Sequence, residues 1–141
     1  MDHDDIDARV LNVTLNGTGF AGQYTAACYR MLPHKNGVWI ELAGVTSGRH
    51  ENAKAFALQH DAAKAYESHA EMVAKIRPDI DNIACANHAH GAYVVEAAQA
   101  GAGVIVLEKP PVLWPGYAVG RSADAETRKT ETMAYLAEVL D

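Results

Sequence analysis

A glycine-rich turn between an apolar stretch and a helical pattern is the feature that most restricts how this chain can fold. Residues 10–15 have the pattern of a strand, residues 17–22 read Gly-Thr-Gly-Phe-Ala-Gly, and helically spaced apolar residues follow as far as Pro33. In a strand–turn–helix unit, the first glycine permits a tight turn and the second lets a ligand approach the backbone. The third lets the helix pack against the strand.

The position of this turn predicts a binding site for the pyrophosphate of a dinucleotide. Backbone N–H groups at a helix N-terminus are exposed and attract phosphate groups. The residues expected to contact the cofactor here are Gly17, Thr18, Gly19, Phe20, Ala21 and Gly22. A purely structural turn is the alternative interpretation, because the glycine spacing by itself is a weak signal.

Strand patterns alternate with helical patterns along the chain. We expect strands at residues 10–15, 38–46, 63–66, 82–86 and 103–107, with helices between them and a last helix at residues 124–140. Strict alternation predicts an α/β protein with a Rossmann-type, doubly wound parallel sheet between two layers of helices, a three-layer αβα arrangement. The continuous apolar run at residues 103–107 is typical of a strand covered on both faces. We expect an acidic leader at residues 1–9 and a single domain at residues 10–141.

Composition and charge exclude several classes of partner. The formal net charge of −6 argues against nucleic acid or an anionic membrane surface, since both require a basic face. No apolar run approaches the roughly 20 residues of a membrane span. The acidic N-terminal residues do not resemble an export signal. Cys28 and Cys85 each lie in an apolar segment, which favours two buried thiols in a cytoplasmic protein.

The end of the second expected strand bears on cofactor choice. An acidic residue that would bind the adenosine ribose is absent there, and Glu41 lies at the start of the strand, away from the carboxyl end where a ligand would sit. Ser47 and Arg49 follow the strand instead. A hydroxyl and a guanidinium suit a 2′-phosphate, so NADP is slightly favoured over NAD. A solvated loop cation is the alternative for Arg49.

Residues 82–111 carry a more specific pattern than the glycines do. One strand ends in Ala86-Asn87-x-x-His90, a helix then ends at Gly101, and the next strand ends in Glu108-Lys109-Pro110. Together with the glycine turn, this pattern resembles the glucose-fructose oxidoreductase, inositol dehydrogenase and rhizopine-catabolism (Gfo/Idh/MocA) family. The resemblance covers residues 10–111, and more loosely the helix that extends to Leu140.

The resemblance implies an NAD(P)-dependent oxidoreductase that transfers hydride between a nicotinamide and a sugar, cyclitol or related polyol. It places Asn87 and His90 near the nicotinamide, and Glu108 and Lys109 beside the nicotinamide ribose and the reacting carbon. Lys109 would orient the substrate hydroxyl or assist its deprotonation; a loop cation is the alternative. Ala86 stands where the family usually has proline, which leaves the shape of that loop open.

Family members normally continue into an α/β substrate domain, whereas this chain stops at Asp141. We therefore expect the chain to bind cofactor and to need a substrate domain for turnover. The face left uncovered is expected to be apolar, which favours a homo-oligomer. The alternative function is a stand-alone dinucleotide-binding or assembly module without chemistry. His88 and His90 lack an accompanying Cys, Asp or Glu cluster, so no metal site is expected.

Overall fold

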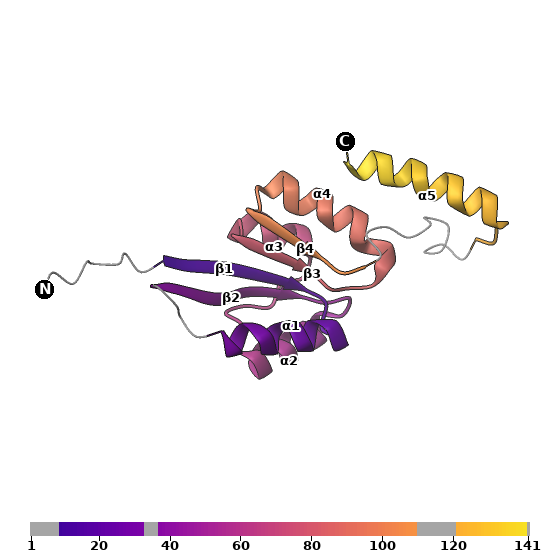
Figure 1. Ribbon diagram of the computed structural model, residues 1–141. Coiled ribbons are helices and arrows are strands. Elements are labelled where there is room, and N and C mark those ends of the chain that lie inside the picture. Colours follow the sequence, from indigo (N-terminus) through magenta and orange to yellow (C-terminus); the bar gives the residue numbers. More distant parts are fainter. Residues whose placement is uncertain (1–8, 33–36, 110–120, 141) are drawn as a thin grey trace, which may run out of the picture.

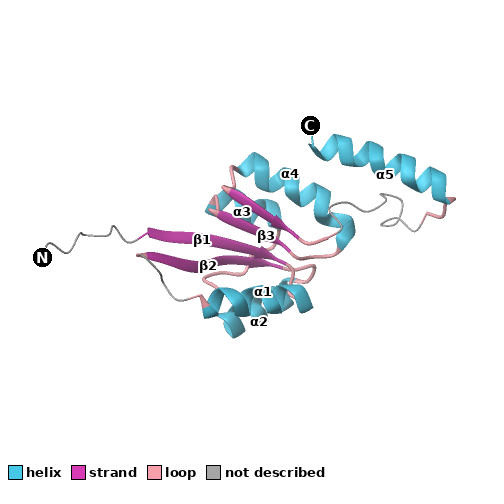
Figure 2. Cartoon of the chain, viewed as in Figure 1, coloured by secondary structure: helices cyan, strands magenta, loops and turns pink. Residues whose placement is uncertain are grey.

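The computed structural model describes residues 9–32, 37–109 and 121–140. A parallel sheet lies between helices in the order β2-β1-β3-β4, which is the Rossmann-type arrangement predicted (Figures 1 and 2). The strands are β1 (Arg9–Asn16), β2 (Val38–Thr46), β3 (Ile80–Ile83) and β4 (Val104–Leu107). The helices are α1 (Phe20–Met31), α2 (His50–His60), α3 (His69–Ile76), the short 3-10 helix η1 (Asn87–Ala89), α4 (His90–Ala100) and α5 (Ala125–Leu140).

The helices change face in the middle of the chain. In Figure 1, α1 and α2 lie along one side of the sheet and α3 and α4 along the other. Val13 and Leu15 of β1 belong to the buried cluster that includes Ala26 of α1 and Phe56 of α2. Thr14, between them, points to the opposite face, where it meets the α3–α4 layer through Asp81 of β3. The carboxyl ends of β1 and β3 therefore flank the point at which the connections reverse, where α/β proteins bind ligands.

Local end signals in the sequence define several helices. The Ser68 hydroxyl accepts a hydrogen bond from the Glu71 amide at 3.2 Å, as expected of a capping box, and α3 ends just before Pro78. Helix α4 ends at Gly101, which has a positive φ of 80° and satisfies the last carbonyls of the helix. Asp124 caps α5 by accepting from the Thr127 amide at 2.9 Å.

The expected strand at residues 63–66 is reduced to a single parallel bridge between Val45 and Ala65. The bridge extends the sheet beyond β2, but this segment is too short to form a regular ladder. The strand expected at residues 82–86 instead spans Ile80–Ile83, and the Ala84 amide continues the pairing with β1 by one bond, to the carbonyl of Asn16 at 2.8 Å.

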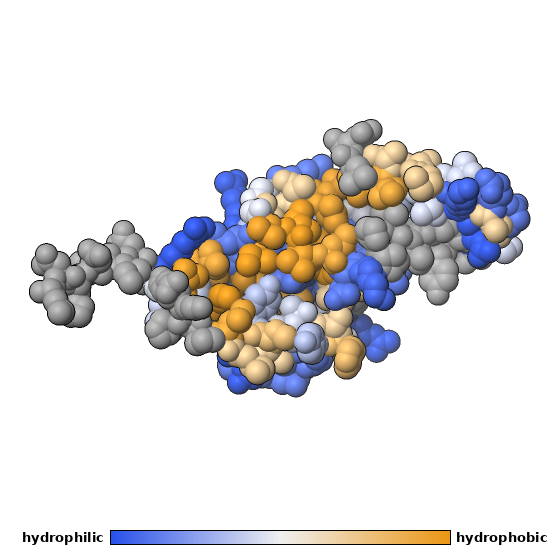
Figure 3. Space-filling view, in the orientation of Figure 1, coloured by the Kyte–Doolittle hydropathy of each residue, from blue (hydrophilic) through white to orange (hydrophobic). Residues whose placement is uncertain are grey.

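The expectation that residues 103–107 are covered on both faces was wrong. Within the described residues, β4 pairs only with β3, and Val104 and Val106 are 54% and 47% exposed. Their side chains share the face of Val13 and Leu15. On that face α1 reaches as far as β3, where Asn82 donates to the Tyr29 hydroxyl at 2.8 Å, and leaves the β4 side chains exposed. Figure 3 shows the resulting apolar surface over β4 and the neighbouring strands.

Helix α5 packs against α4 rather than against the sheet. Gly91 makes this contact possible, because a Cβ there would lie 2.6 Å from the Tyr135 hydroxyl and 2.9 Å from Val139. Met133, one of the apolar residues of this helix, is 57% exposed. The inward face of α5 is therefore rotated toward Tyr135 and Val139.

Candidate functional site

The carboxyl ends of β1, β2 and β3 are joined by backbone hydrogen bonds that shape a groove. The Gly17 amide donates to the carbonyl of Thr46 at 2.9 Å, next to the bond between Ala84 and Asn16. The groove has a volume of about 220 Å³. Its lining comes from the glycine turn, the exit of β2 and the exit of β3: Gly17, Thr18, Gly19, Ser47, Gly48, Ala84, Cys85 and Ala86. The glycine turn and the two strand exits thus converge on one site.

Gly17 and Gly22 are required by the backbone geometry of the turn. Gly17 has a φ of 113°, and a Cβ there would lie 2.3 Å from the carbonyl oxygen of Ala84. A Cβ at Gly22 would lie 1.9 Å from the carbonyl oxygen of Gly17. Because both obstacles are backbone atoms, no side-chain movement relieves them. These two glycines hold the turn and the start of α1 in place.

Gly19 occupies open space, and this distinguishes it from its neighbours. No atom lies within 4 Å of the point where its Cβ would stand. Gly19 is the N-cap of α1, it has no side-chain cap, and the first turn holds no acidic residue. The first N–H groups of a helix have no partner within it, so they are available to an anion here. The space and the donors fit a pyrophosphate group.

The remaining residues of the turn contribute mainly backbone. Phe20 is 90% exposed, so its ring is not part of the core. The hydroxyls of Thr18 and Ser47 are 2.9 Å apart and tie the turn to the exit of β2. Arg49 is exposed just beyond, as the N-cap of α2. The structure therefore brings Ser47 to the groove and leaves Arg49 at its outer edge.

Residues 87 and 90 are placed differently from each other. Asn87 is exposed at the start of η1, next to the exit of β3. His90 is fully buried, and its Nε2 lies 3.2 Å from the carbonyl oxygen of Cys85. His90, which the resemblance places near the nicotinamide, thus contacts the backbone of the Cys85 loop in this arrangement. Burial raises the pKa of the Cys85 thiol to about 11, so this thiol stays protonated at neutral pH.

Glu108 and Lys109 follow β4 on the same edge of the sheet. The Glu108 amide donates to the carbonyl of Ile83 at 3.0 Å, and both side chains are exposed. Pro110, the last residue of the Glu108-Lys109-Pro110 sequence, lies outside the described residues. The ends of β3 and β4 therefore present Asn87, Glu108 and Lys109 on the side of the groove away from β2.

A cluster that the sequence analysis missed lies behind the groove. The His69 ring, fully buried, is held between the carboxylates of Asp81 and Glu96, with Nε2–Oδ2 and Nδ1–Oε2 distances of 2.9 and 2.6 Å. The Thr14 hydroxyl donates to the other oxygen of Asp81 at 2.6 Å. Asp81 in a buried strand was the one available signal, because a buried carboxylate requires a partner.

A second cavity, of about 380 Å³, separates this cluster from the groove. It is lined by Asn16, Thr46, Ser47, Gly48, Glu67, Ser68, His69, Ala70, Tyr93 and Glu96. Ser47 and Gly48 border both hollows. The exit of β2 therefore borders both the groove and the cavity that the buried cluster lines.

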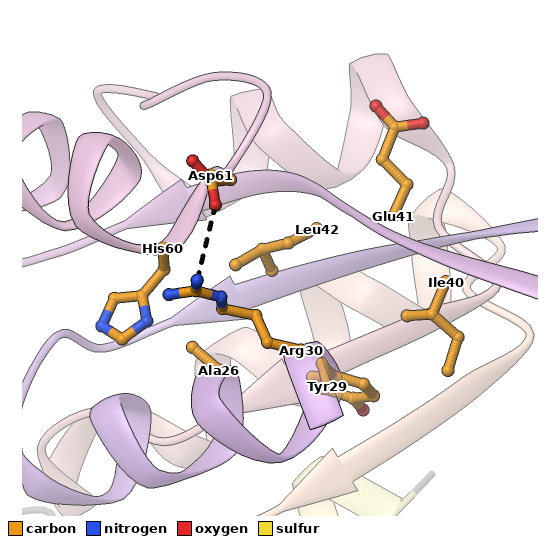
Figure 4. Close-up of a pocket in the computed structure, with 8 residues that line it drawn as sticks. All are labelled: Ala26, Tyr29, Arg30, Ile40, Glu41, Leu42, His60 and Asp61. Carbon is orange, nitrogen blue, oxygen red and sulfur yellow. Dashed lines mark ion pairs between the residues drawn. The ribbon is translucent and has the colours of Figure 1, made fainter. Parts of the chain in front are cut away.

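A third hollow lies at the other end of the sheet, between α1, α2 and β2 (Figure 4). It measures about 210 Å³. The Arg30 guanidinium lies beside His60 and forms an ion pair with Asp61 at 3.8 Å, while Glu41 points away. Burial, and then the nearby Arg30 charge, lower the pKa of His60. This hollow adjoins the C-terminal end of α1, where the helix dipole carries partial negative charge and Arg30 supplies a positive charge.

Comparison with known proteins identifies the fold. The model of the Gfo/Idh/MocA oxidoreductase family that describes its NAD-binding Rossmann fold matches residues 11–135. The chain belongs to this family. The resemblance inferred from the glycine turn and the Glu108-Lys109-Pro110 sequence is thereby confirmed.

Solved structures of larger oxidoreductases share this fold. An NAD-binding oxidoreductase from Klebsiella pneumoniae is 26% identical with a TM-score of 0.66; the match covers 92% of this chain and 32% of that one. Biliverdin reductase from Synechocystis sp. PCC 6803, solved with biliverdin and NADP+, is 26% identical with a TM-score of 0.63, over 89% and 35% of the two chains. Myo-inositol dehydrogenase from Lactobacillus casei, solved with NAD(H) and myo-inositol, is 21% identical and shows the same fold, with a TM-score of 0.66 over 89% and 34%.

The chain spans about a third of the length of these solved structures. No curated protein matched the sequence. In the part of the chain that the structure describes, no helix combines the length and the apolar character needed to cross a membrane.

Proposed function

We propose that this chain is the cofactor-binding part of an NAD(P)-dependent oxidoreductase that acts on a sugar, cyclitol or related polyol. The observation that carries the proposal is the contrast among the glycines. Gly17 and Gly22 are required by the backbone, whereas Gly19 faces open space at an uncapped helix N-terminus. A purely structural turn gives no reason for glycine at residue 19. A bound pyrophosphate gives one, because a side chain at this position would keep the phosphates away from the backbone.

The residues of the groove would divide the cofactor between them. The amides of residues 19–22 would bind the pyrophosphate, and Thr18 and Ser47 would close the groove above the turn. Arg49 lies on the β2 side, where the adenosine end would extend, and would pair with a 2′-phosphate. We therefore keep a slight preference for NADP. Solved neighbours include complexes with NADP+ and with NAD(H), which supports binding of either cofactor.

The opposite side of the groove would serve the reacting end. When bound, the nicotinamide supplies hydride transfer, and the protein supplies position and charge. Asn87 and Glu108 would border the nicotinamide ribose. The exposed ammonium of Lys109 would stabilise a substrate oxygen as negative charge develops on it, and would hold the reacting carbon near the cofactor. His90 would act indirectly, through the Cys85 loop.

The polyol class is supported by the family and by neighbours that act on such molecules, including myo-inositol dehydrogenase and levoglucosan dehydrogenase. Residues that select a substrate belong to the rest of the cleft, so turnover would require a substrate domain.

Both cysteines are free, which supports a cytoplasmic location. The apolar surface over β4 supports self-association.

Titration with NADPH and with NADH, followed by nucleotide fluorescence, tests the proposal. We expect saturable binding of at least one of them, lost on substitution of Gly19 by a bulkier residue. Absence of binding to either cofactor by the folded chain would overturn the proposal. Binding without oxidation of any sugar or polyol would favour the alternative, a dinucleotide-binding module without chemistry of its own.

A further inference from the structure

His69 is the centre of a buried hydrogen-bonded chain that spans four elements. Thr14 of β1 donates to Asp81 of β3, His69 of α3 contacts Asp81, and its other ring nitrogen contacts Glu96 of α4. His69 and Asp81 have no exposed side-chain surface, whereas the Glu96 side chain is 33% exposed. This series of hydrogen bonds therefore runs from the sheet interior to the wall of the 380 Å³ cavity.

An imidazole between two carboxylates must carry a proton on both nitrogens to donate to both. Burial by itself lowers the pKa of His69, but the hydrogen bond and charge of Asp81, followed by those of Glu96, outweigh burial and raise the pKa. The doubly protonated ring is therefore the form that this geometry favours near neutral pH. It neutralises one of the two carboxylates and binds α3, α4 and β3 together.

The cluster is connected to the glycine turn through Tyr93. The Tyr93 and His69 rings are tilted against each other, with centroids 4.6 Å apart. Burial raises the pKa of Tyr93, while a hydrogen bond to the Asn16 side chain acts in the opposite direction. Asn16 ends β1 and immediately precedes Gly17. Tyr93 of α4 and Asn16 also line the same 380 Å³ cavity, so α4 adjoins the strand end that precedes the proposed cofactor groove.

Loss of the proton from His69 leaves one of its two contacts without a donor. Asp81 is fully buried and must keep its hydrogen bond, since an unpaired buried carboxylate is costly. Glu96 can turn toward water in the cavity that it lines. A neutral ring that keeps its Nε2 proton for Asp81 presents a lone pair to a Glu96 oxygen 2.6 Å away, and these two repel each other.

We propose that the Asp81–His69–Glu96 cluster is a proton-dependent lock on the cofactor groove, which keeps α4 and Asn16 in the binding-competent position while His69 is protonated. The inference rests on the proposed dinucleotide-binding function. When pH rises and His69 loses its proton, Glu96 separates, Tyr93 and Asn16 lose their fixed position, and the cofactor binds less tightly. His69 acts here as a positioning residue.

The other ionisable groups around His69 do not produce this transition. Tyr93 from α4 has a raised pKa, and Cys85 beside it titrates only at about 11. Glu67 lines the same cavity and pairs with His50 at 3.3 Å, outside the cluster. Thr14 from β1 does not ionise. Between pH 7 and 9.5 the change is therefore assigned to His69.

The test is the dissociation constant of NADH between pH 7 and 9.5, with NADH chosen because it lacks a titrating 2′-phosphate. In the unsubstituted chain we expect affinity to fall at least about fivefold across this range, the lower end of ordinary coupling between sites. In Glu96→Gln the amide can donate to the neutral ring, so the contact survives without the proton. This variant should lose less than about twofold over the same range. Glu67→Gln, with the same charge change in the same cavity, should retain the dependence of the unsubstituted chain.

A flat profile in the unsubstituted chain would overturn the lock, as would Glu96→Gln and Glu67→Gln with equal slopes. If no cofactor binds at any pH, the proposed function fails and the lock is judged separately by NMR. The His69 ring should then titrate above its ordinary pKa of about 6.5, and the Gly17 amide should shift with the same midpoint. A Gly17 amide that does not respond to the His69 titration would overturn the coupling.

Discussion

The carbonyl oxygen of Gly17 lies 1.9 Å from the point where a Cβ at Gly22 would stand. The first turn of α1 is therefore in direct backbone contact with the end of β1, and the glycine turn is a rigid unit. Its geometry leaves Gly19 facing outward with no neighbour. This arrangement lets the structural and the ligand-binding roles of the glycines be separated by experiment.

Gly17→Ala should destabilise the fold, and Gly19→Ala should not. The first substitution combines a φ of 113° with a clash against the Ala84 backbone, which costs about 3 kcal/mol. The Cβ added by the second would lie in open space, with no atom within 4 Å. Urea denaturation measures the difference, with Gly48→Ala as a control, which should change the free energy of unfolding by less than about 0.5 kcal/mol.

Gly19→Ala should nevertheless weaken cofactor binding at least about tenfold, or about 1.4 kcal/mol. Unchanged affinity would support a purely structural turn.

Arg49→Ala should weaken NADPH more than NADH. A charged hydrogen bond to the 2′-phosphate is worth about 1.5–3 kcal/mol, so NADPH affinity should fall roughly 10- to 100-fold and NADH affinity less than about twofold. Arg30→Ala removes the same charge from the hollow at the other end of α1 and serves as the control. Equal losses for the two nucleotides would remove the preference for NADP.

Lys109→Ala should leave cofactor affinity within about twofold. It should lower the rate of polyol oxidation at least about 100-fold, measured in a form of the protein that includes a substrate domain and oxidises a polyol. The ammonium is exposed at the end of β4 and would act on the substrate oxygen rather than on the cofactor. Lys129→Ala, an exposed lysine in α5, is the control for charge alone. A large loss of cofactor affinity in Lys109→Ala would argue against the catalytic role.

Asp81→Asn should destabilise the protein by about 3 kcal/mol at pH 7, because it leaves a buried imidazolium short of a partner. Asp79→Asn, two residues earlier and partly exposed, should cost about 1 kcal/mol or less. The raised pKa of His69 makes its contribution complete below the unfolded-state pKa of about 6.5. That contribution is lost as pH rises through the folded-state pKa. The loss of unfolding free energy caused by Asp81→Asn should therefore shrink between pH 6, 7.5 and 9, a comparison in which the opposite contribution of His60 cancels. A loss that grows with pH would contradict the assignment.

Val106→Glu should reduce self-association at the apolar surface over β4. Val106 is 47% exposed on a strand with no second partner in the described part of the sheet, so a charge there opposes burial against another copy. Sedimentation velocity should show a smaller mean mass than for the unsubstituted chain. Leu58→Glu, at an 85% exposed position on α2, is the matched control. Equal masses in all three proteins would exclude this surface as an interface.

Much of the architecture follows from local patterns. The glycine turn and the helix end at Gly101 each depend on residues close in sequence, and each was predicted where the structure has it. Strand limits were less predictable: β3 was expected at residues 82–86 and spans Ile80–Ile83, because its limits depend on pairing with β1 and β4, which are distant in sequence. The exposed face of β4 could not be inferred from its sequence, because a strand buried on both faces would have the same run of apolar residues.

The sequence by itself determined the family, the alternation of strands and helices, and the glycine turn, because these depend on local spacing and backbone conformation. The tertiary structure decided which side chains meet. It buried His90 beneath the Cys85 loop and placed His69 between Asp81 and Glu96, which are 12 and 27 residues away. Such contacts depend on how α3 and α4 cross the sheet. No local pattern encodes a charge balance assembled from three separate elements.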